Sequence, residues 1–399
     1  MKYREFGSTG FKVSALGFGA MRLPSVAFIP QSVDLKKSVK LIRHAVDQGI
    51  NYIDTALPYG FGASEKAVGM ALKDGYRDKV HLVTKLFMPF VRKSEDFDDM
   101  LNKQLDKLQT DHIDTYLFHA LNRSFFDKVQ NLNLIDKMIK AKQQGKIRYI
   151  GFSFHDTLPV YKEIVDYFNW DVTQIQYNYM DTGMQATTEG LKYAASKKIA
   201  IVIMEPLKGG MLANPPSEAV SVMKQAQVHR TPVDWGLQYL WNLPEVSVVI
   251  SGMSNHKMVD ENCRSADNSG INTLSTGDIE IIDRLVTIYR SKIVVPCTAC
   301  QYCMNCPQGV NIPQNFALLN NWSAAMNPFF RFLIRRTYKK LSTTADGLNK
   351  QKTNGAANLC TACGLCVKKC PQGINIPEEL KKGVQVLNKG RSIKDVFGK

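Results

Sequence analysis

The chain has 399 residues, of which 44% are hydrophobic and 22% charged, and its formal net charge is +15. This composition is typical of a globular protein with one large core and a smaller second domain, and no run approaches the roughly 20 apolar residues that span a bilayer. The basic residues are spread along the chain, which disfavours nucleic acid as a partner and favours an anionic cofactor or an acidic protein.

The N-terminal sequence MKYREFGSTG carries charges where a signal peptide has its apolar core, so we expect a cytoplasmic protein. Alternating residues on both sides of an STG turn predict a β-hairpin within about the first 20 residues. Eight short apolar runs then predict strands, at 15–20, 51–55, 80–86, 112–119, 147–153, 172–178, 199–205 and 246–252. Helical periodicity is present at 36–48, 64–73, 97–108, 129–144, 157–168, 184–198 and 232–242.

The alternation of strands and helices predicts a mostly parallel sheet, because each helical crossover returns the chain to the same end. Eight such units in about 250 residues predict a closed (β/α)8 TIM barrel. A Rossmann fold is disfavoured because no GxGxxG motif follows the first strand. The composition changes after a last helical segment at 278–291, so we expect a barrel domain at 1–290 and a cysteine-rich domain at 291–399, with a helical insertion near 313–342.

Four polar residues lie at or just past the ends of predicted strands, where the active face of such a barrel is found: Asp54, Tyr59, Lys85 and His119. Carbonyl reduction needs a proton donor, and Tyr59 can donate although its ordinary pKa of about 10 makes it a weak acid. A Lys85 ammonium oriented by Asp54 would lower that pKa, and His119 could polarise the carbonyl. Taken singly, each residue also has an ordinary structural interpretation, such as a helix cap for Asp54.

The segments INYIDTALPYG, LVTKL and IDTYLFH resemble the active-site segments of the aldo-keto reductase family, and the resemblance covers about residues 1–290. It implies hydride transfer between NADP(H) or NAD(H) and a small-molecule carbonyl or alcohol. In that family Tyr59 would be the general acid and base, and Asp54, Lys85 and His119 would complete the tetrad. Candidates to line the substrate pocket are Met21, Arg22, Leu57 and Phe87.

The same resemblance implies where the cofactor binds. Ser153 and Gln174 match the family residues that hold the carboxamide of the nicotinamide. The segment MEPLKGGML resembles the loop that folds over the pyrophosphate, and it contains Met204, Pro206, Leu207 and Gly209. The adenosine end would lie in the segment 251–262, at Ser251, Gly252, Lys257, Glu261 and Asn262.

Three positions depart from the pattern of the family. Phe154 stands where an Asn often contacts the carboxamide, and Met204 replaces the stacking aromatic of many relatives. Met258 stands where an Arg usually meets the 2′-phosphate of NADP, and Lys257 or Arg264 are the candidates to replace it. The choice between NADP and NAD therefore stays open.

Eight of the nine cysteines form two groups, each followed by Pro: Cys297, Cys300, Cys303 and Cys306, and then Cys360, Cys363, Cys366 and Cys370. The second group is the full C-x2-C-x2-C-x3-C-P run of bacterial ferredoxins, in which the fourth cysteine ligates the other cluster. We therefore predict two [4Fe–4S] clusters, one on Cys297, Cys300, Cys303 and Cys370, the other on Cys360, Cys363, Cys366 and Cys306. The first run is one residue shorter, which shortens the reach of Cys306, and zinc is the alternative metal.

The leading hypothesis is an NAD(P)-dependent oxidoreductase with electron-carrying clusters, for which an electron-transfer protein is a candidate partner. One alternative is a nicotinamide-sensing module with little turnover, and another is an electron-transfer module with a vestigial barrel. A hydride carries two electrons whereas each cluster takes one, and the sequence shows no flavin motif that would divide the pair.

Overall fold

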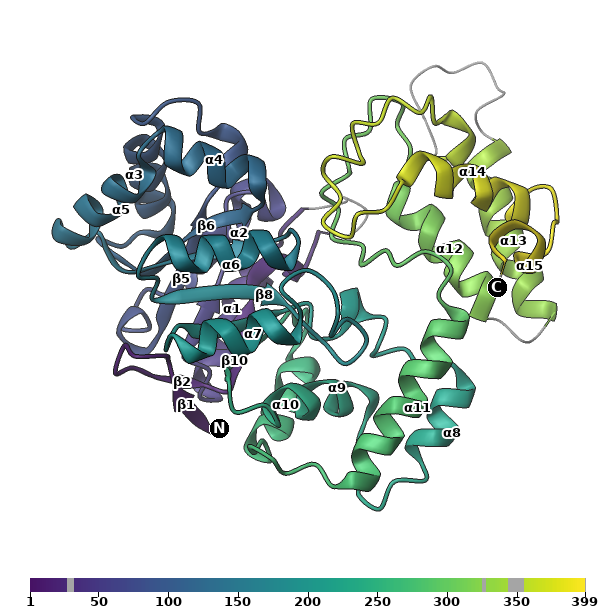
Figure 1. Cartoon of the computed structure of the whole chain (residues 1–399), viewed down its shortest axis with the longest axis horizontal. Helices are drawn as coiled ribbons and strands as arrows, with labels where there is room; N and C mark the ends of the chain where they lie inside the picture. Colours follow the sequence, from purple (N-terminus) through teal and green to yellow (C-terminus); the bar gives the residue numbers. More distant parts are fainter. Residues whose placement is uncertain (27–31, 325–327, 344–354, 399) are drawn as a thin grey trace. The chain divides into compact units, whose positions relative to one another are not determined.

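The computed structural model describes residues 1–26, 32–324, 328–343 and 355–398 (Figure 1). Within this part of the chain, eight parallel strands close into a barrel in the order β10-β3-β4-β5-β6-β7-β8-β9. The strands are β3 (Leu16–Gly19), β4 (Tyr52–Asp54), β5 (His81–Leu86), β6 (Ile113–Leu121), β7 (Ile147–Phe154), β8 (Val172–Gln176), β9 (Ala200–Met204) and β10 (Val246–Ser251). Each predicted apolar run overlaps one of them, and only β6 and β7 extend one or two residues past their runs, so the predicted barrel is confirmed.

The interior of the barrel is filled with side chains. The predicted hairpin is present as β1 (Tyr3–Glu5) paired antiparallel with β2 (Lys12–Ser14). Its residues Phe6 and Val13 pack against inward-facing side chains of the strands, among them Tyr52, Val83 and Leu117. Because these residues are fully buried, the barrel is a packed core, and chemistry is confined to its ends.

Helices surround the strands and bury their apolar faces against them (Figure 1). They are α1 (Leu35–Asp47), α2 (Ala63–Ala71), α3 (Asp96–Leu108), α4 (Arg123–Asn131), α5 (Leu134–Gln143), α6 (Leu158–Tyr167), α7 (Thr187–Ser196), α9 (Pro232–Trp241) and α10 (His256–Asp267). The single helix expected at 129–144 was wrong, because α4 ends at Asn131 and α5 begins at Leu134. Asn133 between them has φ 50°, a left-handed conformation that Asn tolerates and that ends a helix.

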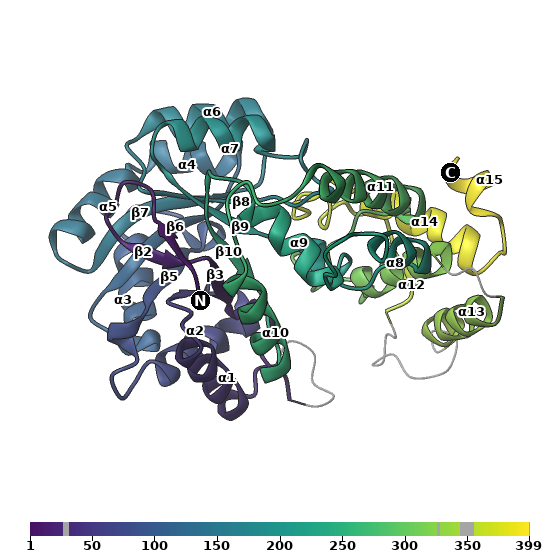
Figure 2. The ribbon, with the colours of Figure 1, turned by 90° about the horizontal axis from the view of Figure 1, so that it is seen from below.

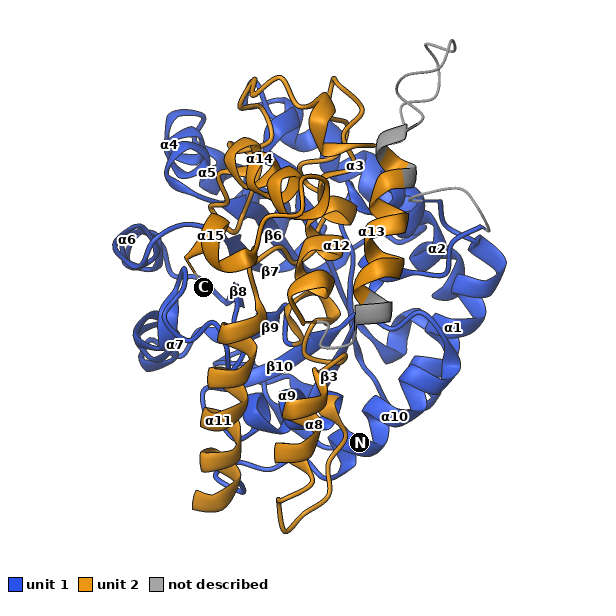
Figure 3. Ribbon diagram, turned by 90° about the vertical axis from the view of Figure 1, so that its right-hand side faces the viewer, with its two compact units in different colours: residues 1–206, 233–275 blue, residues 207–232, 276–399 orange. Residues whose placement is uncertain are grey.

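The described chain divides into two compact units, one of residues 1–206 and 233–275 and the other of residues 207–232 and 276–399 (Figure 3). The second unit contains α8 (Ser217–Met223), α11 (Thr276–Lys292), α12 (Ile312–Ala324), α13 (Pro328–Thr343), α14 (Ile376–Leu387) and α15 (Ile393–Phe397). Helices α8 and α11 lie side by side in both views (Figures 1 and 2). The second unit has a hydrophobic core of its own, which includes Val295, Val310, Phe316, Leu319 and Leu387.

The helical insertion expected at 313–342 is two helices, α12 and α13, and residues 325–327 between them lie outside the described residues. The polar segment that follows them, at 344–354, also lies outside the described part. None of the helices that the structure describes is long and apolar enough to cross a membrane.

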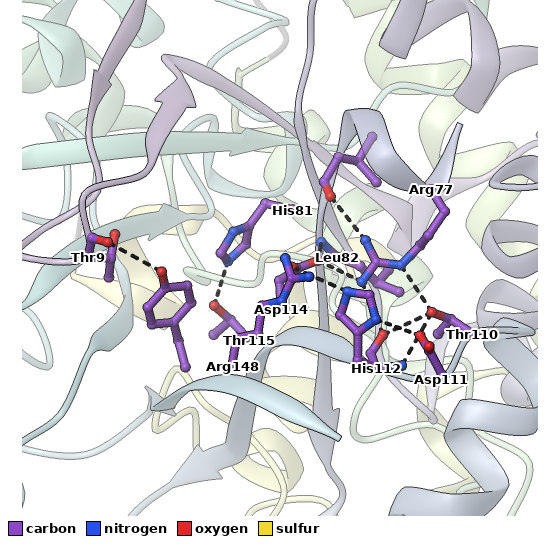
Figure 4. A network of polar contacts seen from close by, with 12 residues as sticks. Thr9, Arg77, His81, Leu82, Thr110, Asp111, His112, Asp114, Thr115 and Arg148 are labelled. Carbon is purple, nitrogen blue, oxygen red and sulfur yellow. Dashed lines mark hydrogen bonds and ion pairs between the residues drawn. The ribbon is translucent and has the colours of Figure 1, made fainter. Parts of the chain in front are cut away.

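A polar network lies at the N-terminal ends of β5, β6 and β7 (Figure 4). Asp114 is buried there and pairs with Arg77 and Arg148, each at 2.8 Å. His81 lies beside this network (Figure 4). Its Nε2 is 2.6 Å from Thr115 Oγ1, and its ring stacks on the ring of Tyr52. Burial lowers the pKa of His81 from 6.5 to about 4. Polar groups at this end of a barrel serve stability.

The depressed pKa of His81 predicts a loss of stability in acid. Between pH 6.5 and 4 the unfolded chain binds a proton that the folded chain does not. The contribution of neutral His81 to the free energy of unfolding is therefore fully present above pH 6.5 and is lost as the pH falls toward 4. A tenfold change in proton affinity corresponds to about 1.4 kcal/mol, so lowering the pH from 7 to 5 removes about 2 kcal/mol through this group. We expect His81→Phe to show a smaller drop in unfolding free energy than the wild type over this range, measured by urea unfolding. Equal drops in both proteins would contradict the assignment.

Candidate active site and cysteine sites

The four residues of the predicted tetrad meet at the C-terminal ends of neighbouring strands. Asp54 ends β4, Lys85 lies on β5 and His119 on β6, and these strands pair directly with one another. Tyr59 begins a short 3-10 turn, Tyr59–Gly62, that follows β4. Gly60 adopts a left-handed conformation in this turn, at φ 55°, and so lets the chain reverse into α2. All four tetrad side chains are buried.

Lys85 and Asp54 form a buried ion pair. Lys85 Nζ lies 2.7 Å from both carboxylate oxygens of Asp54 and donates a further hydrogen bond to the carbonyl of Thr55 at 2.9 Å. Burial lowers the pKa of Lys85 and raises the pKa of Asp54, while their mutual attraction opposes both shifts. Three oxygen acceptors therefore surround Nζ. They fix the position of the ammonium group and stabilise its charge in the place of water.

Tyr59 lies beside this ammonium group and beside His119. Lys85 Nζ is 5.1 Å from the centroid of the Tyr59 ring, and the rings of Tyr59 and His119 are 6.2 Å apart, edge to face. Burial lowers the pKa of His119 well below its ordinary value, and the nearby charge of Lys85 acts in the same direction. The imidazole is therefore neutral at neutral pH, so it can donate or accept a hydrogen bond without carrying charge.

A second buried carboxylate near Lys85, that of Glu65, was missed by sequence reasoning. Glu65 of α2 is fully buried and accepts hydrogen bonds from Thr84 at 2.8 Å and from the amide of Gln104. The same amide donates to the carbonyl of Lys85 at 3.1 Å, and Tyr116 donates to the Gln104 carbonyl oxygen at 2.6 Å. Burial raises the pKa of Glu65. The network fixes the backbone that carries Lys85, and its only sequence signal was a Glu on the apolar face of a helix.

Aromatic side chains border the tetrad. The ring of Phe87 lies 5.8 Å from the His119 ring and 5.0 Å from the ring of Phe90. Phe90 is 63% exposed, and Phe61, two residues after Tyr59, is 70% exposed. Phe87 is one of the residues that the sequence suggested for the substrate pocket, and it is placed where a substrate carbonyl near His119 would meet an apolar wall.

Ser153 and Gln174, the residues expected to hold the carboxamide, lie on the adjacent strands β7 and β8 and pair in register. Ser153 Oγ accepts a hydrogen bond from the backbone N–H of Ala120 at 2.7 Å, which leaves its own proton available for a ligand. Gln174 is buried with its Nε2 3.8 Å from the sulfur of Met204. None of the described residues donates to the buried Gln174 Oε1, so an amide N–H of a ligand would satisfy it.

The expected adenosine-binding residues lie at the end of β10 and on α10. Asn262 Nδ2 donates to Ser251 Oγ at 3.0 Å, and both residues are buried. Lys257 and Glu261 are exposed and lie one turn apart on the helix, with Lys257 Nζ 3.8 Å from Glu261 Oε1. Gly252 lies under the side chain of Arg22, where an added Cβ would be 3.2 Å from Cδ of that arginine.

Residues expected to cover the pyrophosphate follow β9. Met204 ends this strand in the first unit, and Pro206 closes that segment as a buried residue. In the second unit the chain continues through Leu207 into the 3-10 turn Lys208–Gly210, in which Gly209 has φ 67°. Tyr289 of α11 donates to the carbonyl of Leu212 at 3.2 Å and so fixes the end of this loop within its own unit.

The eight cysteines line two separate cavities in the second unit. We call them site 1, lined by Cys297, Cys300, Cys303 and Cys370, and site 2, lined by Cys306, Cys360, Cys363 and Cys366. Each cavity thus takes three cysteines from one run and the last cysteine of the other run, as the ferredoxin pattern predicts. The shorter spacing before Cys306 does not keep that residue out of site 2.

The electrostatics of the thiols follow the same grouping. Burial, together with the neighbouring thiols of Cys300, Cys297 and Cys370, raises the pKa of Cys303 to about 12. Burial also raises the pKa of Cys366, with contributions from Cys360, Cys306 and Cys363. The raised pKa values keep these thiols protonated when no metal is bound, whereas a metal cluster would bind them as thiolates and release the protons. The ninth cysteine, Cys263, is buried in the core of the first unit.

Comparisons with known proteins agree with this arrangement. The profile of the Aldo/keto reductase family matches residues 15–287, and that of the 4Fe-4S dicluster domain matches residues 296–375. The L-galactose dehydrogenase of Arabidopsis thaliana is 28% identical over 305 residues, which span 71% of this chain and 94% of the relative. The NADH-specific methylglyoxal reductase of Escherichia coli is 29% identical over 230 residues, which span 53% of this chain and 69% of the relative.

Solved structures show the same barrel. The holo form of an aldo-keto reductase from Bacillus halodurans has a TM-score of 0.60 and 26% identity, covering 71% of this chain and 96% of that one. A Klebsiella pneumoniae enzyme solved with NADP and acetate has a TM-score of 0.60 at 23% identity, covering 72% and 96%, and this likeness shows the fold alone. The family profile covers more than half of the chain, so this chain belongs to the aldo/keto reductase family of oxidoreductases and carries a C-terminal 4Fe-4S dicluster-type domain.

Proposed function

We propose that this chain reduces a small-molecule carbonyl, or oxidises the corresponding alcohol, with Tyr59 as the general acid and base. The observation that carries the proposal is the buried Asp54–Lys85 ion pair beside the Tyr59 ring. A buried ammonium group with a fixed counter-ion next to a phenol is an arrangement that stabilises a phenolate. Such pairs of titratable groups with displaced pKa values are typical of catalytic sites.

When bound, a nicotinamide supplies or accepts the hydride, and [4Fe–4S] clusters exchange single electrons. Tyr59 donates its hydroxyl proton to the oxygen of the substrate carbonyl. Lys85 stabilises the negative charge that then develops on the phenol oxygen, and Asp54 keeps Lys85 charged and in position. His119, neutral and buried, orients the carbonyl oxygen by a hydrogen bond. Alcohol oxidation follows the same proton path in reverse.

Ser153 on β7 and Gln174 on β8 fit a nicotinamide carboxamide. Gln174 Oε1 can accept the amide N–H, and the Ser153 hydroxyl can donate to its carbonyl oxygen. We propose that Met204, Pro206, Leu207 and Gly209 cover the pyrophosphate and that Ser251, Gly252, Lys257, Glu261 and Asn262 contact the adenosine. Both NADP(H) and NAD(H) are compatible with this set. Lys257 and Arg264 are the candidates to replace the missing arginine, and Lys257 Nζ already lies 3.8 Å from Glu261 Oε1.

The two cavities lined by four thiols each support two [4Fe–4S] clusters, one in site 1 and one in site 2. We propose that a cluster domain beginning near residue 291 exchanges electrons with an acidic protein partner, which suits the net charge of +15. A cytoplasmic location stays a prediction from the sequence.

The test uses full-length protein purified without oxygen. We expect oxidation of NADPH or NADH on addition of a panel of small aldehydes and ketones, with stoichiometric alcohol formation. Binding of the nucleotide without turnover of any carbonyl would instead favour a nicotinamide-sensing module. Absence of nucleotide binding would reject the proposed function.

A further inference from the structure

Two loops of the second unit touch through their backbones. Gly209, in the loop Leu207–Leu212, has φ 67°, and a Cβ built on it would lie 2.0 Å from the carbonyl oxygen of Thr298. The carbonyl carbon and Cα of Thr298 would follow at 2.6 and 2.8 Å. Contacts this short with backbone atoms leave room for no residue but glycine. Any shift of either loop therefore acts directly on the other.

Thr298 belongs to the wall of site 1. It lies between Cys297 and Cys300, is 2% exposed and lines the same cavity as those thiols. The chain just before Cys297 is fixed by Asn320 of α12, whose side chain accepts from the N–H groups of Val294 and Val295 at 3.1 and 3.0 Å. After Cys297 the loop carries the thiols of Cys300 and Cys303, which line site 1, so a group that binds these thiols would also hold the loop.

We infer that the first cysteine loop supports nucleotide binding from within the second unit, because the backbone of Thr298 positions the loop Leu207–Leu212. This inference rests on the proposed function, in which that loop covers the pyrophosphate. Backbone N–H groups bind a phosphate well only when they are held in one conformation, so a site 1 that holds its four thiols together also holds the phosphate loop. By linkage, a bound nucleotide must in turn stabilise an occupied site 1.

Two neighbouring glycines provide a matched test. Gly210 has φ 95°, so Gly210→Ala introduces backbone strain as Gly209→Ala does, but a Cβ on Gly210 would meet no atom within 4 Å. The dissociation constants of NADPH and NADH are measured by fluorescence titration of anaerobically purified full-length protein. We expect Gly209→Ala to weaken binding on the order of tenfold more than Gly210→Ala, within the usual range for coupled sites. We also expect Gly209→Ala alone to change the electron paramagnetic resonance signal of the cluster in site 1.

A second pair of variants changes the thiols and leaves the phosphate loop intact. Cys303→Ser removes a thiol of site 1, and Cys363→Ser removes one of site 2. We expect the loss of nucleotide affinity to be on the order of tenfold larger for Cys303→Ser. A third measurement needs no variant: NADPH added to wild-type protein should slow the loss of site 1 iron to a chelator.

The outcomes separate the inference from the function beneath it. The inference is wrong, and the proposed function stands, if the wild-type protein binds nucleotide but the two members of each variant pair lose the same affinity for it. The same holds if added nucleotide does not change the rate at which site 1 loses iron. If wild-type protein binds neither nucleotide, the proposed function is wrong and the inference falls with it. Where a variant fails to fold, as judged by circular dichroism, iron release from the wild type decides.

Discussion

Replacement of Tyr59 by Phe is expected to reduce kcat for carbonyl reduction by about 10²–10⁴-fold, the usual contribution of a positioned general acid. The change removes one oxygen and keeps the ring that packs near His119, so the dissociation constant of the nucleotide should stay within about twofold. The measurement is steady-state turnover of a reactive aldehyde, combined with fluorescence titration of NADPH and NADH. The proton donor would have to be another group if Tyr59→Phe kept more than about a tenth of wild-type kcat.

Tyr149→Phe is the matched control for this experiment. Its hydroxyl donates to the carbonyl of Thr9 at 3.3 Å, and it lies at the opposite end of the barrel beside His81. Removing this hydroxyl costs one half-buried hydrogen bond, worth about 1 kcal/mol of stability, and should leave kcat close to that of the wild type. A similar fall in kcat for both variants would indicate general damage to the barrel.

Much of the active site could be predicted because it follows from strand periodicity. The polar residues Asp54, Lys85 and His119 each interrupt or end an apolar run, and parallel strands in a barrel must bring such positions together. The cysteine spacing was equally informative, because the reach of a short loop limits which thiols can share a cavity.

Other features depend on contacts that periodicity does not encode. The break at Asn133 was missed because α4 and α5 both bury apolar faces, so the apolar pattern continues across it. Glu65 could not be distinguished from a solvent-exposed glutamate, because its partners Thr84 and Gln104 come from different elements. The packing of residues 207–232 within the second unit is tertiary in the same sense, since α8 packs against α11 and Gly209 lies against the backbone of Thr298.

The exchange of cysteines between the two runs predicts which cluster each variant loses. In our assignment Cys370→Ser, although it lies in the second run, damages site 1, and Cys306→Ser damages site 2. Each change removes one of four ligands, so we expect the iron content to fall toward about half that of the wild type while the other cluster is kept. If each run instead held its own cluster, the two variants would exchange their effects.

Two reference variants decide between these assignments, because their sites are the same in both. Cys300→Ser affects site 1 whichever way the last cysteines are shared, and Cys363→Ser affects site 2. The electron paramagnetic resonance spectrum of reduced Cys370→Ser should therefore match that of Cys300→Ser, and Cys306→Ser should match Cys363→Ser. The reverse matching would show that the runs do not exchange ligands. Since cysteines of both sites pack against the core around Phe316 and Leu319, either loss should also lower the unfolding temperature of the second unit.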